Sequence, residues 1–233
     1  MAVGWTDWHE RSSRHYSEPR NHCLAPGGSE YGRYLWVRSH IAPGDRVLDI
    51  GCNCGQLAEN LTRDLGCEVV GVDVIQEFVD YCNANKPGTF VCGDFGAMES
   101  GRLHALSGDD GHVHRFDVIT ALEVIEHDID VRMLIVKAWY MLKPGGKLIV
   151  TTPHPDGITG YAIQGQEGAH VRVWTRWRLE AAFSIAFDCP IDYTEIMRDE
   201  CGRLLSMGVV WKKDDWPEGD TWAQQLRRKG IPL

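Results

Sequence analysis

Residues 47–61 read VLDIGCNCGQLAENL. A short apolar run contains Asp49, a turn with Gly51 and Gly55 at its edges follows, and apolar residues then recur at helical spacing. Strand, glycine turn and helix in this order are typical of the place where a doubly wound α/β sheet holds a nucleotide-like ligand. The stretch therefore predicts a fold class and a ligand site together.

The alternation of strands and helices continues over residues 46–152. Five apolar runs are short enough to be strands, namely RVLDI, EVVGV, TFVCG, FDVITA and KLIVTT. Segments with helical patterns lie between some of these runs, at residues 56–66, 77–86 and 130–146. Near-continuous apolar strands separated by helices predict a parallel sheet that is covered on both faces.

The C-terminal part of the sequence has a different pattern. Residues 175–186 place apolar side chains on one helical face, and residues 191–198 and 203–213 read as two strands joined by a short turn. The two strands predict an antiparallel hairpin. The whole pattern therefore predicts an α/β, doubly wound, Rossmann-like seven-stranded mixed sheet with a C-terminal antiparallel hairpin.

Composition narrows the functional class. The 233 residues are 43% hydrophobic and 24% charged, as in a soluble globular domain, and contain no apolar stretch of membrane-spanning length. The first residues lack the pattern of a secretory signal, so we expect a cytoplasmic protein. The net charge of -9 disfavours non-specific binding to nucleic acid or anionic membranes. Eight cysteines without a CxxC pair favour buried, reduced thiols over disulfides.

Acidic residues at the ends of the predicted strands indicate the kind of ligand. Asp73 closes the second strand at the spacing where a carboxylate binds ribose hydroxyls. Asp94 and Phe95 follow the third strand, where a carboxylate can accept an adenine amino proton and a ring can stack on the base. Asp49 precedes the first glycine, a position unfavourable for a pyrophosphate and favourable for an ammonium or a sulfonium group. Asn53 takes the middle of the turn, and asparagine tolerates left-handed backbone geometry.

Five motifs in order resemble class I S-adenosylmethionine-dependent methyltransferases: VLDIGCNCG, VVGVD, CGDF, FDVITALEVIEH and MLKPGGKLIVTTP. The resemblance covers residues 46–153 and implies S-adenosyl-L-methionine as cofactor. Asn53 departs from the commonest glycine of that family. The residues that it implies as cofactor-binding are Asp49, Gly51, Asn53, Gly55, Asp73, Val74, Asp94, Phe95 and Leu122.

The string EVIEH, residues 123–127, allows more than one interpretation. It resembles both ubiquinone-pathway-like O-methyltransferases and the enzymes that 2′-O-methylate the 3′ end of small RNAs, where the string resembles a divalent-metal site. In that second interpretation Glu123, Glu126, His127 and His170 would bind Mg²⁺, Mn²⁺ or Zn²⁺. The alternatives are a metal-free general base at His127 and a purely structural role. His154, just beyond the fifth strand, is a second candidate base, or an ordinary loop histidine.

These features predict that the chain is divided into three parts. Residues 1–42, rich in Trp, Tyr and His, form a lid or acceptor-pocket segment, or pack plainly on the sheet. Residues 43–212 form the S-adenosylmethionine-binding methyltransferase domain, and residues 213–233 form a polar tail.

The predicted function is S-adenosylmethionine-dependent methyl transfer to an oxygen of a small molecule or glycan, with nitrogen and carbon left open. The alternatives are a metal-dependent 3′-terminal RNA 2′-O-methyltransferase and a non-catalytic cofactor-fold binding protein. The negative charge and the lack of a basic patch disfavour RNA. The sequence does not predict the acceptor, the oligomeric state or the pathway.

Overall fold

The computed structural model of the protein describes residue 24 and residues 30–107, 116–127, 130–155, 172–186, 191–198 and 204–212. The expectations for residues 1–23, for His170 and for the tail at 213–233 lie outside these ranges. The boundaries predicted at residues 43 and 213 stay predictions.

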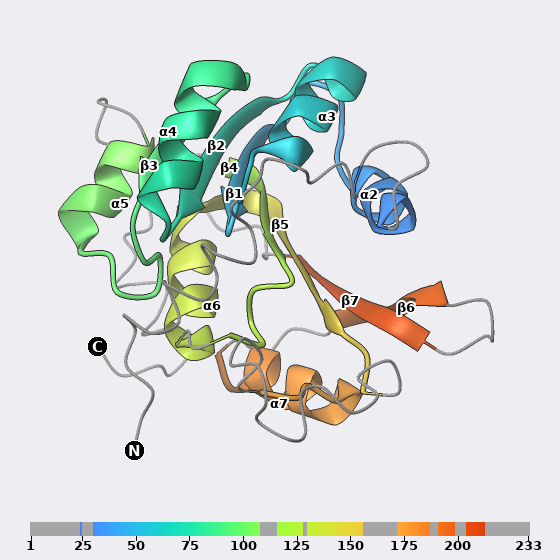
Figure 1. Ribbon diagram of the computed structural model, residues 1–233. Helices are drawn as coiled ribbons and strands as arrows, with labels where there is room; N and C mark the ends of the chain where they lie inside the picture. The colour runs from blue at the N-terminus through green and yellow to red at the C-terminus, as the bar shows by residue number, and fades with distance from the viewer. Residues whose placement is uncertain are drawn as a thin grey trace.

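The described elements alternate between helix and strand up to β5 (Figure 1). The helices are α2 (Tyr31–Arg38), α3 (Gln56–Leu65), α4 (Gln76–Asn85), α5 (Ser100–Ser107), α6 (Val131–Met141) and α7 (Arg176–Ala186). The strands are β1 (Arg46–Ile50), β2 (Glu68–Asp73), β3 (Thr89–Cys92), β4 (Phe116–Leu122), β5 (Leu142–Pro153), β6 (Ile191–Arg198) and β7 (Leu204–Lys212).

Within the described residues the strands form one seven-stranded sheet in the order β3-β2-β1-β4-β5-β7-β6. Strands β1 to β5 pair in parallel, whereas β7 runs antiparallel to both β5 and β6. The predicted mixed sheet with a C-terminal hairpin is therefore confirmed. The strand order reverses between β1 and β4, and ligands of doubly wound sheets bind at such a switch point.

The third predicted helix ends close to the predicted stop. The pattern at residues 130–146 predicts a helix that is ended by Pro144 and two glycines, and the observed helix ends at Met141, with Leu142 in an extended conformation that opens β5. A proline disfavours helical geometry at the residue before it and cannot donate a backbone hydrogen bond.

Two hydrophobic clusters cover the two faces of the sheet. Neighbouring residues of β1 point to opposite faces, so Leu48 packs with α5, α6 and α7 while Val47 packs with α2, α3 and α4. Trp139 of α6 and Trp211 of β7 are fully buried in the first cluster. Both faces of the central strands are thus buried, as the continuous apolar runs predict.

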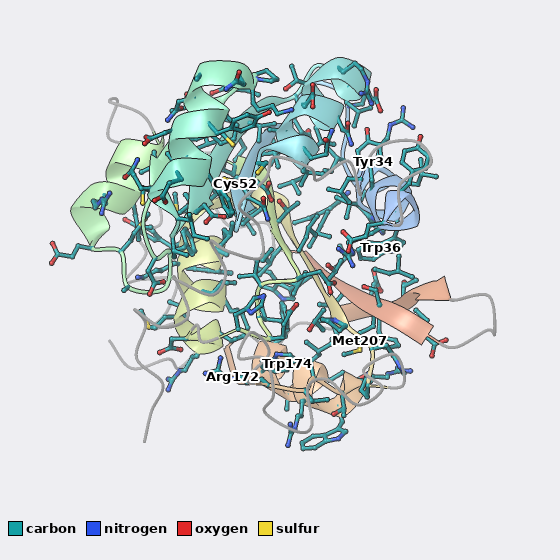
Figure 2. All side chains as sticks on the ribbon, in the orientation of Figure 1. Tyr34, Trp36, Cys52, Arg172, Trp174 and Met207 are labelled. Carbon is teal, nitrogen blue, oxygen red and sulfur yellow. The ribbon has the colours of Figure 1, made fainter. Side chains whose placement is uncertain are left out.

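Helix α2 is part of the second hydrophobic cluster, the one that contains Val47 (Figure 2). The side chain of Tyr34 is fully buried, and its hydroxyl donates to the carboxylate of Asp64 on α3. Trp36 packs against Gly208 of β7 so closely that a Cβ atom on Gly208 would overlap the indole ring. The N-terminal aromatics were expected to form a lid or to pack on the sheet, and Tyr34 and Trp36 do pack on it.

Two further expectations concern thiols and membranes. The five described cysteines carry free thiols, and four of them are buried. Within the part of the chain that the structure describes, the helices are too short or too polar to cross a membrane.

Candidate functional site

The turn between β1 and α3 has a backbone that few side chains tolerate. Gly51, Asn53 and Gly55 have φ angles of 73°, 47° and 70°, so alternate residues take left-handed geometry. Only glycine adopts such angles without cost, and asparagine tolerates them better than most residues. The turn is anchored to β2, because Gly51 N and Cys52 N donate to the carbonyl oxygen of Val72 at 2.8 Å and 3.1 Å. The left-handed geometry expected at Asn53 is observed.

Asp73, at the end of β2, organises the same turn. Its Oδ2 accepts from Asn53 N at 2.8 Å, and its Oδ1 accepts from Ile75 N at 3.0 Å. A carboxylate has about four lone-pair positions, so it can accept from several donors at once. Asp73 therefore has a structural role that the sequence pattern does not reveal, in addition to its predicted ligand role.

Asp49 is buried beside this turn. Its side chain accepts from Thr120 Oγ1 of β4 at 2.7 Å. Burial raises the pKa of Asp49 to about 7; the hydrogen bond from Thr120 opposes this shift and the nearby carboxylate of Asp73 adds to it. Among the described residues, no basic side chain contributes to the shift, and the carboxyl groups of Asp49 and Asp73 lie close enough to influence each other. A cationic ligand fits such a pair of carboxyl groups.

The edge after β3 is held by a lysine of α6. Lys137 Nζ donates to the carbonyl oxygens of Phe95 and Met98 at 3.2 Å and 2.7 Å. Asp94 Oδ1 accepts from Gly96 N at 2.8 Å, which closes the turn. Phe95 is 2% exposed and belongs to the hydrophobic core, and its stacking on an adenine base stays a prediction. The structure thus places Asp94 at the edge and Phe95 beneath it.

Val74 and Leu122 lie where β2 and β4 end. Val74 is half-buried and packs against the small cluster of Cys54, Ile75 and Phe78. Leu122 is half-buried and packs on the cluster around α3. Both predicted cofactor-binding residues are therefore at the carboxyl edge of the sheet.

The turn after β4 approaches the glycine turn closely. A Cβ atom on Gly51 would lie 2.5 Å from Val124 Cγ2, so the two turns touch at the switch point. Glu123 also has left-handed geometry, with a φ of 55°. Its backbone N donates to Thr151 O at 3.0 Å, which fixes this conformation against β5.

Two carboxyl groups follow β4, that of Glu123 half-buried and that of Glu126 buried. Glu123 Oε1 accepts from Thr151 Oγ1 at 2.9 Å and from Ser206 Oγ at 3.2 Å. Glu126 Oε2 accepts from Thr152 Oγ1 at 3.1 Å, and this residue is 1% exposed. Burial raises the pKa of both carboxyl groups, and the proximity of Glu123 raises that of Glu126 further.

The metal site expected from EVIEH is not formed by the described residues. Among them, no three side chains of His, Cys, Asp or Glu are gathered as metal ligands, although Glu123, Glu126 and His127 are all described. Glu123 and Glu126 instead accept hydrogen bonds from hydroxyl groups of β5 and β7. His170, the fourth expected ligand, lies outside the described residues.

A strap of residues before α7 holds the backbone of the EVIEH turn (Figure 2). Trp174 Nε1 donates to Ile125 O at 2.8 Å, Arg172 N donates to Glu126 O at 3.0 Å, and Arg172 Nη1 donates to His127 O at 2.6 Å. Three consecutive carbonyl groups are therefore bound by two residues. The resemblance that groups His170 with the EVIEH residues indicates that this segment approaches the turn, but it does not indicate the bonds from Arg172 and Trp174.

The candidate bases lie at the same edge. His127 closes the turn after β4 and His154 directly follows β5, and both are half-buried. Because β4 and β5 are neighbours, the two imidazole-bearing positions follow adjacent strand ends. Their catalytic roles stay predictions.

A family profile described as "Methyltransferase domain" matches residues 16–187. The chain belongs to this methyltransferase domain family. The matched residues include the glycine turn, Asp73, Asp94 and the EVIEH turn. The prediction that the chain is a methyltransferase is confirmed at the level of the family.

Curated relatives of this methyltransferase domain share about half of the chain. The ubiquinone biosynthesis O-methyltransferase of Bradyrhizobium diazoefficiens is 37% identical over 109 residues, which cover 47% of this chain and 40% of that protein. The homologous enzyme of Xanthomonas axonopodis pv. citri is 33% identical over 132 residues, covering 56% and 51%. The matches thus span about half the length of these relatives.

A solved structure shares the fold at low identity. Phosphoethanolamine N-methyltransferase 2 of Haemonchus contortus has a TM-score of 0.68 at 16% identity, covering 92% of this chain and 61% of that one. At this identity the likeness shows the class I methyltransferase fold and does not extend to the acceptor.

Proposed function

We propose that the protein transfers the methyl group of S-adenosylmethionine to a hydroxyl oxygen of a small molecule or glycan. The observation that carries the proposal is the pair of carboxyl groups at the switch point, where Asp49 and Asp73 lie beside three left-handed residues of the glycine turn. Family membership supports methyl transfer as the reaction.

The residues present fit the cofactor. The left-handed turn at residues 51–55 lets the backbone approach the methionine portion, and Asp49 offers a buried negative charge to its cationic groups. Asp73 places a carboxylate at the end of β2 for the ribose hydroxyls, and Asp94 offers its second oxygen to the adenine amino group. The bound cofactor supplies a methyl group that its sulfonium already activates.

Oxygen is the acceptor atom that the relatives support. The named curated relatives are O-methyltransferases, whereas the N-methyltransferase named above is similar in fold alone. A hydroxyl acceptor loses a proton as it gains the methyl group, and His127 and His154 are the candidate bases at the strand ends. The chain's own contribution is to bind and orient the two substrates and to take up this proton.

Two measurements test the proposal. Isothermal titration calorimetry should detect binding of S-adenosylmethionine and S-adenosylhomocysteine, and both compounds, but not NAD, should raise the melting temperature. With cofactor labelled in the methyl group, label should pass to phenols and catechols such as 3,4-dihydroxybenzoate and not to phosphoethanolamine or short single-stranded RNA. Absence of cofactor binding, or transfer to the amine or RNA alone, would refute it.

A further inference from the structure

Arg33 brings a positive charge from the N-terminal helix to the turn after β4. Its Nη1 donates to Glu30 Oε2 at 3.0 Å, and its Nη2 lies 3.4 Å from Glu123 Oε1. The side chain is only 8% exposed. Helix α2, which precedes the glycine turn in sequence, thus contacts the turn after β4.

Of the two carboxyl groups of the turn, Glu123 forms the ion pair with Arg33, and Glu126 lies within the range of its charge. Arg33 lowers the pKa of both Glu123 and Glu126, against the larger effect of burial. The hydrogen bonds to the Glu123 carboxylate come from neutral hydroxyls, those of Thr151 and Ser206, and the nearby Glu30 carboxylate raises the pKa of Glu123. Within the described part of the chain, Arg33 is therefore the cation of this acidic cluster.

The described residues do not by themselves form a divalent-metal site at this cluster. A metal ion needs several carboxylate or imidazole groups that converge on one point, and the described residues contain no such group of three. Glu123 Oε1 lies 3.4 Å from Arg33 Nη2 and accepts from the hydroxyl groups of Thr151 and Ser206. Among the described residues its contacts are therefore with one cation and two neutral donors.

Arg33 also has an unused donor. Arg33 Nε and Glu126 Oε1 are buried and have no hydrogen-bond partner among the described residues. A buried donor without a partner is costly, and a guanidinium N–H binds an oxygen that gains negative charge more strongly than a neutral one. Glu123 keeps 22% of its side chain exposed, so solvent reaches the cluster at Glu123.

We propose that Arg33 takes the place of a divalent metal in the EVIEH cluster and that its Nε–H binds the oxygen of the methyl acceptor. The second half of this inference rests on the proposed function. As the acceptor O–H bond breaks and the O–CH₃ bond forms, the cofactor C–S bond breaks, the proton passes to a base of the site, and Arg33 stabilises the developing charge on oxygen.

The first experiment addresses the metal and does not need an acceptor. Wild-type protein is dialysed against EDTA and titrated with Mg²⁺ and with Mn²⁺, which avoid the thiol binding expected of Zn²⁺. We expect no saturable binding and no change in melting temperature. A 1:1 site that is abolished by Glu123→Gln would overturn the proposal, whether or not the protein binds S-adenosylhomocysteine.

The second experiment addresses the acceptor. Arg33→Met keeps much of the volume and removes the charge, and Arg38→Met is the matched control on the same helix, where Arg38 is 42% exposed and lies 4.0 Å from Asp64. With 3,4-dihydroxybenzoate as acceptor, Arg33→Met should lower kcat/KM about 10- to 100-fold at unchanged S-adenosylhomocysteine affinity, as expected for one charge-assisted bond. Arg33→Lys should restore part of the loss, and Arg38→Met should match the wild type.

Equal kcat/KM for Arg33→Met and Arg38→Met would overturn the acceptor role. If Arg33→Met does not fold, Arg33→Lys serves instead, since it retains the charge but lacks Nε–H, and an unchanged kcat/KM in that variant would also overturn the role. Loss of cofactor binding by the wild type would refute the proposed function and leave the metal experiment valid.

Discussion

The guanidinium group of Arg172 donates to the carbonyl oxygen of His127 at 2.6 Å, across 45 residues of sequence. The indole of Trp174 adds a second bond to the same turn, at Ile125 O. These donors determine the backbone path from residue 125 to residue 127. They therefore set where the side chains of Glu126 and His127 point.

Trp174→Phe should separate this donor from simple packing, because it keeps a ring and removes the indole N–H. The loss of one bond to a partly buried carbonyl should cost about 1–3 kcal/mol and lower the melting temperature by several degrees. Methyl transfer should fall while S-adenosylhomocysteine affinity stays the same. Trp177→Phe is the control, because that ring is 64% exposed on the neighbouring α7. Equal melting temperatures for the two variants would show that the indole bond is unimportant.

Asp49 should make stability depend on pH. Its pKa is about 7 in the folded protein and 3.8 in an ordinary setting. Between these values the unfolded chain releases a proton that the folded protein keeps, so this contribution to stability is complete below pH 3.8 and is lost as the pH rises to 7. Asp49→Asn should therefore be more stable than the wild type at pH 8, by up to about 4 kcal/mol, and similar to it at pH 4.

Thermal denaturation of both proteins at pH 4, 6 and 8 measures this difference. Asp80→Asn is the control, because Asp80 is exposed on α4. Asp49→Asn should also bind the cofactor more weakly, because it removes the buried negative charge. A melting temperature for Asp49→Asn below that of the wild type at every pH would contradict the pH argument.

Cofactor binding by the wild type should release a proton near neutral pH. A cation beside Asp49 lowers its pKa, so the carboxyl group that is partly protonated at pH 6.5 becomes ionised on binding. Affinity should then weaken as the pH falls below 7. Calorimetry at pH 6.5 in two buffers with different ionisation enthalpies measures the proton count. Identical binding enthalpies in the two buffers would show that Asp49 does not titrate on binding.

Local patterns were sufficient for the sheet and for placing the glycine turn and the acidic residues at its carboxyl edge. The apolar runs and the acids that close them are contiguous in sequence, so the positions of Asp49, Asp73 and the glycine turn could be predicted without coordinates. Their contacts with a cofactor stay predictions. The burial of Phe95 could not be predicted, because it depends on how the residues after β3 pack into the core.

The contacts that sequence could not predict join distant segments. Arg33 meets Glu123 from a helix that precedes the sheet, and Arg172 meets His127 from beyond β5. Each residue type occurs many times in the chain, and neither position has a periodicity or motif that marks it. The predicted metal ligands illustrate the same limit, because spacing shows which residues share a turn and not which partners their carboxylates take.

Replacement of Asn53 by glycine should change stability little, whereas replacement by valine should lower it. Its φ of 47° is accessible to glycine without strain, whereas a β-branched residue is strongly disfavoured there. Asn53→Gly loses the bond from Cys54 N to the Asn53 side chain and should change stability by less than about 1 kcal/mol. Asn53→Val should be less stable by roughly 1–3 kcal/mol and bind S-adenosylhomocysteine more weakly, because the turn shifts. Chemical denaturation and calorimetry measure both effects, and equal behaviour of the two variants would argue against strain at this position.

Gly208→Ala should weaken the docking of α2 on the sheet. A Cβ atom at this position would overlap the ring of Trp36 and lie 2.6 Å from Ile196 Cδ1, so the helix or the strand must shift. Overpacking of this kind costs about 1–3 kcal/mol. Gly101→Ala in α5 is the control, because a Cβ atom there meets nothing within 4 Å, and alanine in a helix should be neutral or slightly stabilising. If Gly208→Ala unfolds at the same denaturant concentration as the wild type, the contact between Trp36 and β7 is looser than described. A lower midpoint that Trp36→Leu partly restores in the double variant would identify the ring as the obstacle, since the smaller side chain leaves room for the methyl group.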